Sequence, residues 1–375
     1  MNPPNIGHPE RSGGSGATRK RQILRCAQDD NVANSENATA RYRWTLLRAG
    51  PLLLDGGSMF GVVPRALWSR NIQPDETGRI LLGHNCLLLE RCEPSIATTP
   101  SVGQTSLSTA SSPGRILIET GSGDPLKYDE KFRKIFGLVD RSIITALDDV
   151  ATRCEDIAHV VVTHLHFDHA GGLTRKAGAG EKPDWIAPDA PANDAGLKLT
   201  FPNAGITVQS REWDDAVMNR SVMTRTYLRE HLDPIRQRVG FVDSPPPFPP
   251  GHLPQRDELP KTSVNQRETE ILPGVFAFLV PGHTWGQQAI RFIDDRKQSI
   301  VFTPDVLPTV NHVGAAYNMA YDVEPFISTV TRRWFLEEAA SNNWILVLDH
   351  EAGHPVHRVK RDGKGWYQLV SEQCP

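Results

Sequence analysis

The feature that most constrains this chain is a group of three histidines and one aspartate that follows a short apolar strand. The segment IAHVVVTHLHFDHAGG begins as a β-branched run and ends in a polar loop that contains His164, His166, Asp168 and His169. The run is typical of a buried strand, and α/β folds place their chemistry where such strands end. We therefore expect a fold that buries this strand and exposes the loop after it to a site.

The residue types and their spacing predict a metal site. Imidazole nitrogens and carboxylate oxygens are the donors that zinc prefers. On extended backbone, residues two apart point to the same side, so His164 and His166 could bind one ion, while Asp168 and His169, after the chain turns, could face a second. Chance placement of this template is on the order of one in a thousand, which leaves little room for ordinary loop histidines.

Three further candidate ligands stand later in the chain, each at the end of an apolar strand. They are His283 in LVPGHTWG, Asp305 in IVFTPDV and His350 in ILVLDH. Each alone would more often be an ordinary surface or core group. Together with the first four side chains they make a set of seven donors.

The remaining pattern predicts an α/β (α+β) fold. Strands are expected in RWTLLRAGPLLLDGG, as a strand, a hairpin and a second strand, and then in LLGHNCLLLE and GRILIETG. YDEKFRKIFGL and RSIITALDDV predict helices. The second half repeats this order: GVFAFLV, QQAIRFI, SIVFTPD and WILVLDH as strands, and a helix in VEPFISTVTRRWFLEEAA with Phe326, Val330 and Trp334 on one face. We expect two mixed sheets packed together with helices outside.

Composition divides the chain into an extension and one catalytic domain. Residues 1–40 are rich in Gly, Ser, Asn, Arg and Asp and are expected to be disordered, and residues 41–375 form the domain. Within it, residues 94–113 predict a Ser/Thr-rich hairpin insertion, and residues 243–262 predict an irregular proline-rich loop.

Charge and apolar content restrict the partners. The formal net charge is -3, so no basic field favours nucleic acid, and we expect a small-molecule substrate instead. No apolar run approaches the roughly 20 residues of a membrane span, and the N-terminus lacks a signal-peptide core. The five cysteines form no CxxC pair. We expect a cytoplasmic protein, and a homodimer is left open.

THLHFDHAGG, followed by PGHT and by the strand-ending Asp305 and His350, resembles the metallo-β-lactamase superfamily, over roughly Tyr42 to Tyr367. The resemblance implies a four-layer αββα sandwich and two zinc ions per chain. It places His164, His166 and His283 on the first metal. It places Asp168, His169 and His350 on the second, with Asp305 between the two.

The bridging Asp305 resembles the lactonase, thioesterase, phosphodiesterase and phosphotriesterase branches rather than the members that cleave β-lactams. Softer motifs, DGGSMFGVVPRALW, LGHNCLLLE, YDEKFRKIFGL and FPNAGITVQSREW, are similar to the acyl-homoserine-lactone lactonase and methyl parathion hydrolase branch. Two departures affect the loops around the ligands. Trp285 and Gln287 replace a Pro and a His common after PGHT, and Thr303-Pro304 precedes Asp305 where relatives have Gly.

The resemblance implies a metal-activated hydroxide as nucleophile, with Asp168 as the catalytic residue that moves a proton toward the leaving group. No GxSxG elbow competes with it. The favoured hypothesis is a quorum-quenching type of lactonase or a related carboxylic ester hydrolase. A phosphotriester or aryl-phosphate hydrolase on the same metals is the alternative, and a non-catalytic binding protein is a third.

Aromatic and sulfur-containing side chains are candidates for an apolar substrate pocket, although each is also ordinary core material. They are Met59, Phe60, Trp185, Phe201, Trp213 and Trp285. In the loop after Asp305, His312 and Tyr317 could also reach the substrate. The histidines without ligand-like companions are expected to be core or solvent groups: His84, His159, His252, His354 and His357.

Overall fold

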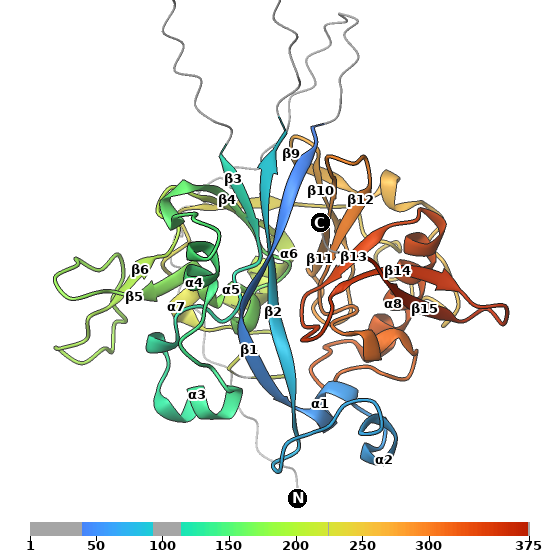
Figure 1. Ribbon diagram of the computed structural model, residues 1–375, viewed down its shortest axis with the longest axis horizontal. Coiled ribbons are helices and arrows are strands. Elements are labelled where there is room, and N and C mark those ends of the chain that lie inside the picture. Colours follow the sequence, from blue (N-terminus) through green and yellow to red (C-terminus); the bar gives the residue numbers. More distant parts are fainter. Residues whose placement is uncertain (1–39, 93–113, 224, 374–375) are drawn as a thin grey trace, which may run out of the picture.

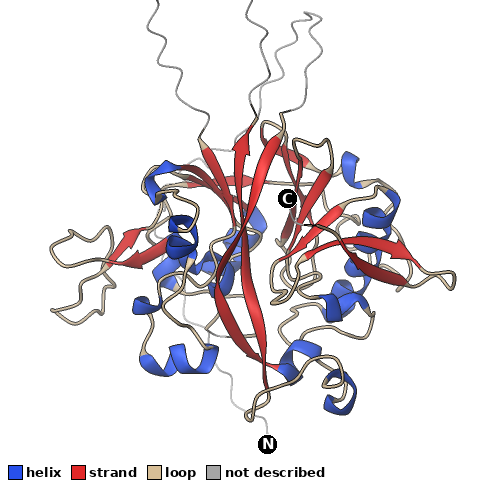
Figure 2. Cartoon of the chain, viewed as in Figure 1, coloured by secondary structure: helices blue, strands red, loops and turns tan. Residues whose placement is uncertain are grey.

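Two large β-sheets face each other at the centre of the protein, and helices cover their outer faces (Figure 1). The computed structural model describes residues 40–92, 114–223 and 225–373. The four-layer sandwich expected from the sequence is confirmed, and Figure 2 shows strands in the middle with helices on both sides. The extension before residue 40 and the insertion over residues 94–113 lie outside the described residues.

The first sheet combines a long antiparallel pair with shorter parallel strands, because β3, β4, β7 and β8 run parallel to one another. Its strand order is β1-β2-β3-β4-β7-β8. The strands are β1 Tyr42–Asp55, β2 Arg79–Arg91, β3 Arg115–Ile118, β4 Ile157–Val161, β7 Gly205–Gln209 and β8 Val239–Val242.

The prediction of a hairpin inside the first strand was wrong. β1 pairs with β2 along its whole length, and the register shifts only between Arg48 and Pro51. Gly50 has a φ of 115°, which only glycine adopts easily. The Gly-Pro pair therefore forms a bulge that bends the strand without reversing it.

The second sheet is antiparallel except where β12 and β13 run parallel. Its strand order is β15-β14-β13-β12-β11-β10-β9. The strands are β9 Thr269–Leu272, β10 Val275–Leu279, β11 Gln288–Ile293, β12 Ser299–Thr303, β13 Ile345–Leu348, β14 Val356–Arg361 and β15 Tyr367–Ser371. A small separate sheet pairs β5 Thr174–Lys176 with β6 Leu197–Leu199.

The helices begin and end where local chemistry satisfies their backbone. In α3, Asp129 accepts a hydrogen bond from the Phe132 N–H at the first turn, and Gly137 with a φ of 63° ends the helix. Ser142 and Thr145 form a capping box at the start of α4. The α-helices are α1 Gly56–Phe60, α2 Arg65–Trp68, α3 Glu130–Phe136, α4 Ile143–Asp148, α5 Phe167–Ala170, α6 Ser210–Val217, α7 Arg229–Leu232 and α8 Pro325–Ser341.

Short 3-10 turns, labelled η, connect several of these elements. They are η1 Pro125–Lys127, η2 Cys154–Asp156, η3 Gly171–Leu173, η4 Val264–Gln266 and η5 Val310–Val313. The proline-rich stretch between β8 and η4 contains neither helix nor strand. Among the described residues, no helix is both long enough and apolar enough to cross a membrane.

Three apolar layers hold the sandwich together. Between the sheets, Trp44 and Val161 of the first sheet pack in one cluster with Phe292 and Phe302 of the second. The outer face of the first sheet packs against α4, α6 and α7, and that of the second against α8. Helix α8 buries Val330 and Trp334 as predicted, whereas Phe326, in its first turn, is 47% exposed. At the end of β4, Val160 packs on one face of the sheet and Val161 on the other, which explains why both positions are apolar.

Candidate metal centre

The loop after β4 carries the first four candidate ligands. His166 is still extended, with a ψ of 156°, and the short helix α5 begins at the next residue. After this change from extended to helical backbone, His169 belongs to a different group of donors from His164 and His166, although its ring centroid lies 3.9 Å from that of His164. The structure thus shows the local geometry that the spacing predicted.

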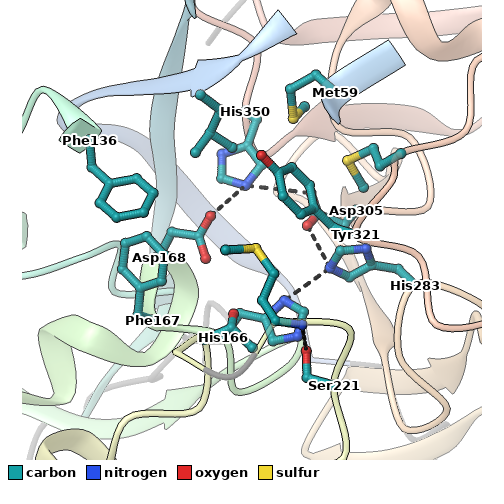
Figure 3. A pocket seen from close by; sticks show the side chains of 14 residues that line it. Met59, Phe136, His166, Phe167, Asp168, Ser221, His283, Asp305, Tyr321 and His350 are labelled. Carbon is teal, nitrogen blue, oxygen red and sulfur yellow. Dashed lines mark hydrogen bonds and ion pairs between the residues drawn. The ribbon is translucent and has the colours of Figure 1, made fainter. Parts of the chain in front are cut away.

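A first group of donors converges from three loops. Nε2 of His164 lies 3.1 Å from Nδ1 of His166, which lies 3.0 Å from Nε2 of His283. Oδ2 of Asp305 lies 3.0 Å from Nε2 of His283 and 3.7 Å from Nε2 of His164. These four atoms lie within 4.8 Å of one another, and all four residues are buried. Figure 3 shows His166, His283 and Asp305 pointing toward one another.

A second group forms on the other side of Asp305. Nε2 of His350 lies 3.1 Å from Nε2 of His169, and Asp305 lies 3.4 Å from the former and 3.6 Å from the latter. The carboxylate of Asp168 lies 3.7 Å from Nε2 of His350 and 3.9 Å from Nε2 of His169. Asp305 is thus within reach of both groups.

In four of these histidines, the ring nitrogen that points away from the centre contacts a polar group outside it. Nδ1 of His350 faces the Gly83 carbonyl at 2.9 Å, and Nδ1 of His164 faces the Thr163 hydroxyl at 3.1 Å. Nδ1 of His283 lies 3.0 Å from Asp322 and Nδ1 of His169 lies 3.2 Å from Glu119. An N–H on that side leaves the inward nitrogen with a free lone pair, which is the arrangement that metal-binding histidines use.

The donor set fits two divalent cations. Five buried imidazoles cannot all satisfy inward-facing lone pairs with one another, and Oδ1 of Asp305 is buried without a hydrogen-bond partner among the described residues. Donors about 2.0–2.2 Å from a tetrahedral ion lie roughly 3.3–3.6 Å apart, close to the separations seen here. The residues present therefore match a pair of ions that share Asp305.

Electrostatics identifies Asp305 as a negative charge among the imidazoles. Burial alone would lower the pKa of His283, but the carboxylates of Asp305 and Asp322 outweigh it and raise that pKa to about 10. Burial would raise the pKa of Asp305, yet the surrounding imidazoles hold it well below its usual range. Asp305 is therefore an anion in the centre of the site.

Comparison with known proteins agrees with this geometry. The model of the metallo-β-lactamase superfamily matches residues 112–199, which include the first four candidate ligands. The chain has the metallo-β-lactamase fold. The family match covers the strand and loop that carry the histidine motif, and the two sheets supply the rest of the sandwich.

Relatives and neighbours of known structure are also hydrolases by name. An N-acyl homoserine lactonase of Bacillus cereus is 23% identical over 257 residues, which are 66% of this chain and 79% of that protein. A probable metal-dependent hydrolase from Staphylococcus aureus superposes with a TM-score of 0.63 at 23% identity, covering 90% of this chain and 99% of that one. AidC, a dizinc quorum-quenching lactonase in complex with its product, gives a TM-score of 0.60 at 16% identity, with the same coverage.

Two carboxylates that the sequence reasoning missed stand behind the second donor group of this metallo-β-lactamase fold. Glu119 accepts the Thr163 N–H at 2.5 Å and faces His169. Asp349 accepts the His350 N–H at 2.8 Å, and its other oxygen lies 3.9 Å from Nδ1 of His169. Burial first, and then the charge of Asp305, raises the pKa of Asp349. The four donors that lie within 4.8 Å of one another on this side are His169, Asp305, Asp349 and His350, so Asp349 takes the place expected for Asp168 in this group. Because Asp349 approaches the outer nitrogen of His169, we assign it as a partner of that ligand, and Asp168 as the carboxylate on the inner side.

A third buried carboxylate connects the two loops of the first group. Glu212 accepts hydrogen bonds from the Leu165 N–H at 2.9 Å, the Thr284 hydroxyl at 2.6 Å and the Tyr227 hydroxyl at 3.0 Å. Gly286 permits this contact, because a Cβ there would lie 2.3 Å from the Glu212 nitrogen. Glu212 therefore fixes the His164–His166 loop relative to the His283 loop.

An apolar cavity lies against both donor groups. Its lining includes Asp168, His283 and His350 together with Met59 and Tyr321 (Figure 3). Phe136, Phe167, Leu54, Met223 and Met319 supply most of the apolar wall. Met59 is thus the one proposed pocket residue that this cavity includes.

The other proposed pocket residues do not line this cavity, because each is used in packing. Phe60 stacks on His312 with ring centroids 5.0 Å apart, and Tyr317 contacts Phe60 edge-on at 5.8 Å. The imidazole of His312 is fixed between the Thr309 hydroxyl at 2.8 Å and the Met59 carbonyl at 2.9 Å. These three residues therefore support Met59 from behind.

The tryptophans and Phe201 are also structural in position. Trp213 is buried against Phe241, and Phe201 belongs to the same cluster on the outer face of the first sheet. Trp285 lies under the Arg211 guanidinium at 4.9 Å. Trp185 bridges to Leu197 beside the small sheet. The lining is supplied instead by α3, by α5 and by the loop before α8.

The histidines excluded from the site lie apart from both donor groups. His84 is the nearest to the centre. It is buried, with its Nε2 2.9 Å from the Ser122 hydroxyl and its ring 6.2 Å from that of His350. His84 packs behind the second group and is not among its donors.

Proposed function

We propose that this protein is a dinuclear metal-dependent hydrolase that opens small lactones carrying an apolar substituent. The observation that carries the proposal is the pair of donor groups that share Asp305 and lie against an apolar cavity. The metallo-β-lactamase domain and the lactonase relatives and neighbours identify a hydrolase that cleaves ester bonds. The lactone class and the two-metal mechanism are inferred from this site.

Seven side chains would hold the ions. His164, His166 and His283 offer the first site its nitrogens, His169 and His350 do the same for the second with Asp168 beside them, and Asp305 serves both. When bound, two divalent ions, with zinc as the expected metal, would make hydroxide available at neutral pH and polarise the substrate carbonyl.

Asp168 is placed to move a proton. It lines the cavity, and its side chain is 10% exposed, more than the other six donors of the centre. A carboxylate beside the nucleophile can accept its proton and return it to the alkoxide that leaves when the ring opens. We therefore assign Asp168 two roles, as ligand and as general acid-base.

Tyr321 contributes a phenolic hydroxyl to a cavity whose lining also includes Ser221 and Thr226. Burial first, and then the charges of Asp55, Asp168 and Asp305, raise the pKa of Tyr321 to about 12. The hydroxyl therefore stays protonated at neutral pH and can donate a hydrogen bond to a carbonyl or to the oxyanion that forms from it. Removing one such donor costs roughly 10²-fold in turnover in other hydrolases.

The cavity wall selects for an apolar group beside the ester. Leu54, Phe136 and Phe167 contribute carbon surface, and Met59, Met223 and Met319 contribute flexible thioethers. The cavity measures about 40 Å³, whereas sites for drug-sized ligands enclose roughly 300–1,000 Å³. The methionine side chains must therefore move aside for an acyl chain, which their three rotatable bonds allow.

A hydrolysis panel on zinc-loaded protein tests the proposal. We expect N-acyl homoserine lactones to be cleaved with a higher kcat/KM than a phosphotriester, an aryl ester, a thioester or a β-lactam. Asp305→Asn should remove the activity toward every member of the panel, which excludes a contaminating esterase. A phosphotriester that is cleaved faster than every lactone would contradict the lactone assignment and favour the phosphotriesterase alternative.

The length of the acyl chain on the lactone provides a second test of the proposed substrate. Lactones with a hexanoyl or longer acyl chain should have a lower KM than the acetyl analogue, because the apolar wall contributes to binding. Met59→Ala should weaken binding of the long-chain lactone more than that of the acetyl analogue. Equal KM values across chain lengths would exclude the apolar wall as the acyl site.

A further inference from the structure

A second and larger cavity lies away from the metal centre, against α8, the η5 loop and the turn before β15. It measures about 440 Å³, which is within the range of small-molecule sites, and it shares no lining residue with the cavity at the metal centre. Figure 1 shows α8 beside β15, the edge strand of the second sheet. Nothing in the proposed hydrolase function uses this space.

The cavity lining carries an excess of positive charge. Arg256, Arg332 and Arg333 line it with a single carboxylate, that of Asp257. Within the described part of the chain, neither Arg256 nor Arg333 has a hydrogen-bond or ion-pair partner. Their guanidinium donors are therefore available to an anion that enters the cavity.

The guanidinium group of Arg332 is a fixed positive charge in the lining of the cavity. Arg332 is buried and donates to the carbonyl oxygens of Val306 at 2.8 Å, His312 at 3.1 Å and Tyr317 at 2.9 Å, and to the Asn318 side chain at 2.9 Å. None of these acceptors is a carboxylate. The charge of Arg332 is thus held in place by neutral oxygens, and a ligand anion would meet a site that is already ordered.

The remaining lining is apolar and aromatic. The Trp366 ring is 63% exposed, Tyr367 follows it, and Leu336 and Val313 contribute aliphatic surface. Tyr367 is oriented by the hydrogen bond from its hydroxyl to Glu337 at 2.6 Å. An inorganic anion would use only the guanidinium groups, whereas an anion with a hydrocarbon or ring body would also cover the exposed tryptophan face.

We propose that this cavity is a binding site for a small organic carboxylate with an apolar or aromatic body. Guanidinium groups bind carboxylates through paired N–H donors, which a lysine or an amide cannot reproduce. The body of the ligand would pack on Trp366 and Leu336. The site is independent of the metal centre, so the proposal does not depend on the reaction that takes place there.

Calorimetric titration of the full-length, metal-loaded protein with benzoate tests this site. The test variant is Arg256→Gln/Arg333→Gln, and its matched control is Arg70→Gln/Arg238→Gln, which removes the same two charges from exposed positions outside both cavities. We expect the test variant to lose one class of benzoate sites, with at least a 10-fold weaker affinity, while the control binds like the wild type. Benzoate that binds at the metal centre is present in all three proteins and cancels in the comparison.

Two further ligands separate the contributions of charge and ring. Benzamide, which is neutral, should not bind at the Arg256/Arg333 site, and inorganic phosphate should bind more weakly than benzoate. Trp366→Ala should reduce benzoate affinity and leave phosphate affinity unchanged. Identical benzoate isotherms for the wild type and the test variant would overturn the proposal, and phosphate binding as tightly as benzoate would overturn the assignment of an apolar ligand body.

Discussion

The two donor groups of the metal centre differ in what surrounds them, although they share Asp305. The first group consists of three imidazoles, and a hydroxyl and one carboxylate engage the outer nitrogens of two of them. The second group has only two imidazoles, but Asp168 lies on its inner side and Glu119 and Asp349 lie behind His169. The first ion would therefore be held mainly by enclosed nitrogen donors, and the second mainly by negative charge.

The two groups also differ in access to the cavity. His164 is fully buried, whereas Asp168 of the second group is the most exposed donor. Two sites built so differently should respond differently to substitution, and variants can be chosen that affect both sites, one site, or only the shell behind one site.

Replacing the shared carboxylate should have the largest effect. In Asp305→Ala, both groups lose a donor, so the bound metal should fall from about two equivalents to well below one, and turnover should fall by roughly 10³-fold or more. Elemental analysis of the purified protein and kcat measurement check this. An Asp305→Ala protein that keeps two ions would show that Asp305 does not serve both groups.

Replacing a ligand of one group should remove one ion. We expect His350→Ala to retain about one equivalent of metal and to lose roughly 10²-fold or more in kcat, because the second ion is required to activate the nucleophile. Asp168→Ala should lose still more activity, since it removes both a donor and the proton carrier. Activity within a few-fold of wild type in either variant would contradict the two-metal mechanism.

Replacing the carboxylates behind the ligands should have a smaller and selective effect. Asp349→Asn and Glu119→Gln should reduce the affinity for the second ion by roughly 10–100-fold and leave the affinity for the first ion unchanged. Asp322→Asn is the matched control. Because Asp322 contacts His283, this variant should reduce the affinity for the first ion and leave the affinity for the second ion unchanged. Metal removal by a competing chelator should then show two phases, and loss of the same phase in all three variants would refute the distinction between the groups.

Glu212 tests the positioning of the first group without touching an ion. Glu212→Gln retains the size of the side chain but removes its charge. A buried polar group that lacks part of its hydrogen bonds lowers the free energy of unfolding by roughly 1–3 kcal/mol. We expect a lower Tm and a normal metal content. Tyr227→Phe removes one of the three donors to Glu212 and should cost less, about 1 kcal/mol. Equal unfolding temperatures for wild type and Glu212→Gln would show that Glu212 does not stabilise the two loops.

The smallest expected effect concerns Lys127, a partly buried lysine that contacts the start of η3. The Lys127 amine donates to the Gly171 carbonyl and to the Thr174 hydroxyl, and burial lowers the pKa of Lys127 from 10.5 to about 7. Between these values the unfolded chain binds a proton that the folded chain does not, so this residue adds stability as pH rises from 7 toward 10.5. The Tm difference between wild type and Lys127→Met should therefore shift in favour of wild type over that range. A difference that is constant with pH would show that Lys127 stays charged.

Much of the fold follows from local pattern. Apolar runs and caps predicted β4, β10, β12, β13 and the helices α3 and α8. The Gly50-Pro51 pair misled the prediction, because turn residues also form bulges, and only pairing with β2 distinguishes the two. Strand pairing is a long-range property that a local pattern does not contain.

In the candidate site, too, the sequence pattern indicates some residues and not others. The donors brought together by the structure are those with a metal-binding spacing or a strand-ending position, such as His169 and His350. Of the predicted pocket residues, only Met59 lines the cavity at the metal centre, because the sequence does not show whether an aromatic residue such as Trp213 faces a ligand or the core. Two signals were present for the missed carboxylates. Asp349 immediately precedes a ligand, and Glu119 follows a buried strand at the matching edge of the sheet and has a φ of 68°.

Anomalous diffraction at the zinc edge, on crystals of the zinc-loaded protein, tests the shared carboxylate most directly. We expect two peaks roughly 3.5–4 Å apart, one beside His164, His166 and His283 and the other beside His169 and His350, with Asp305 between them. A single peak, or two peaks of which neither lies within coordination distance of Asp305, would contradict it.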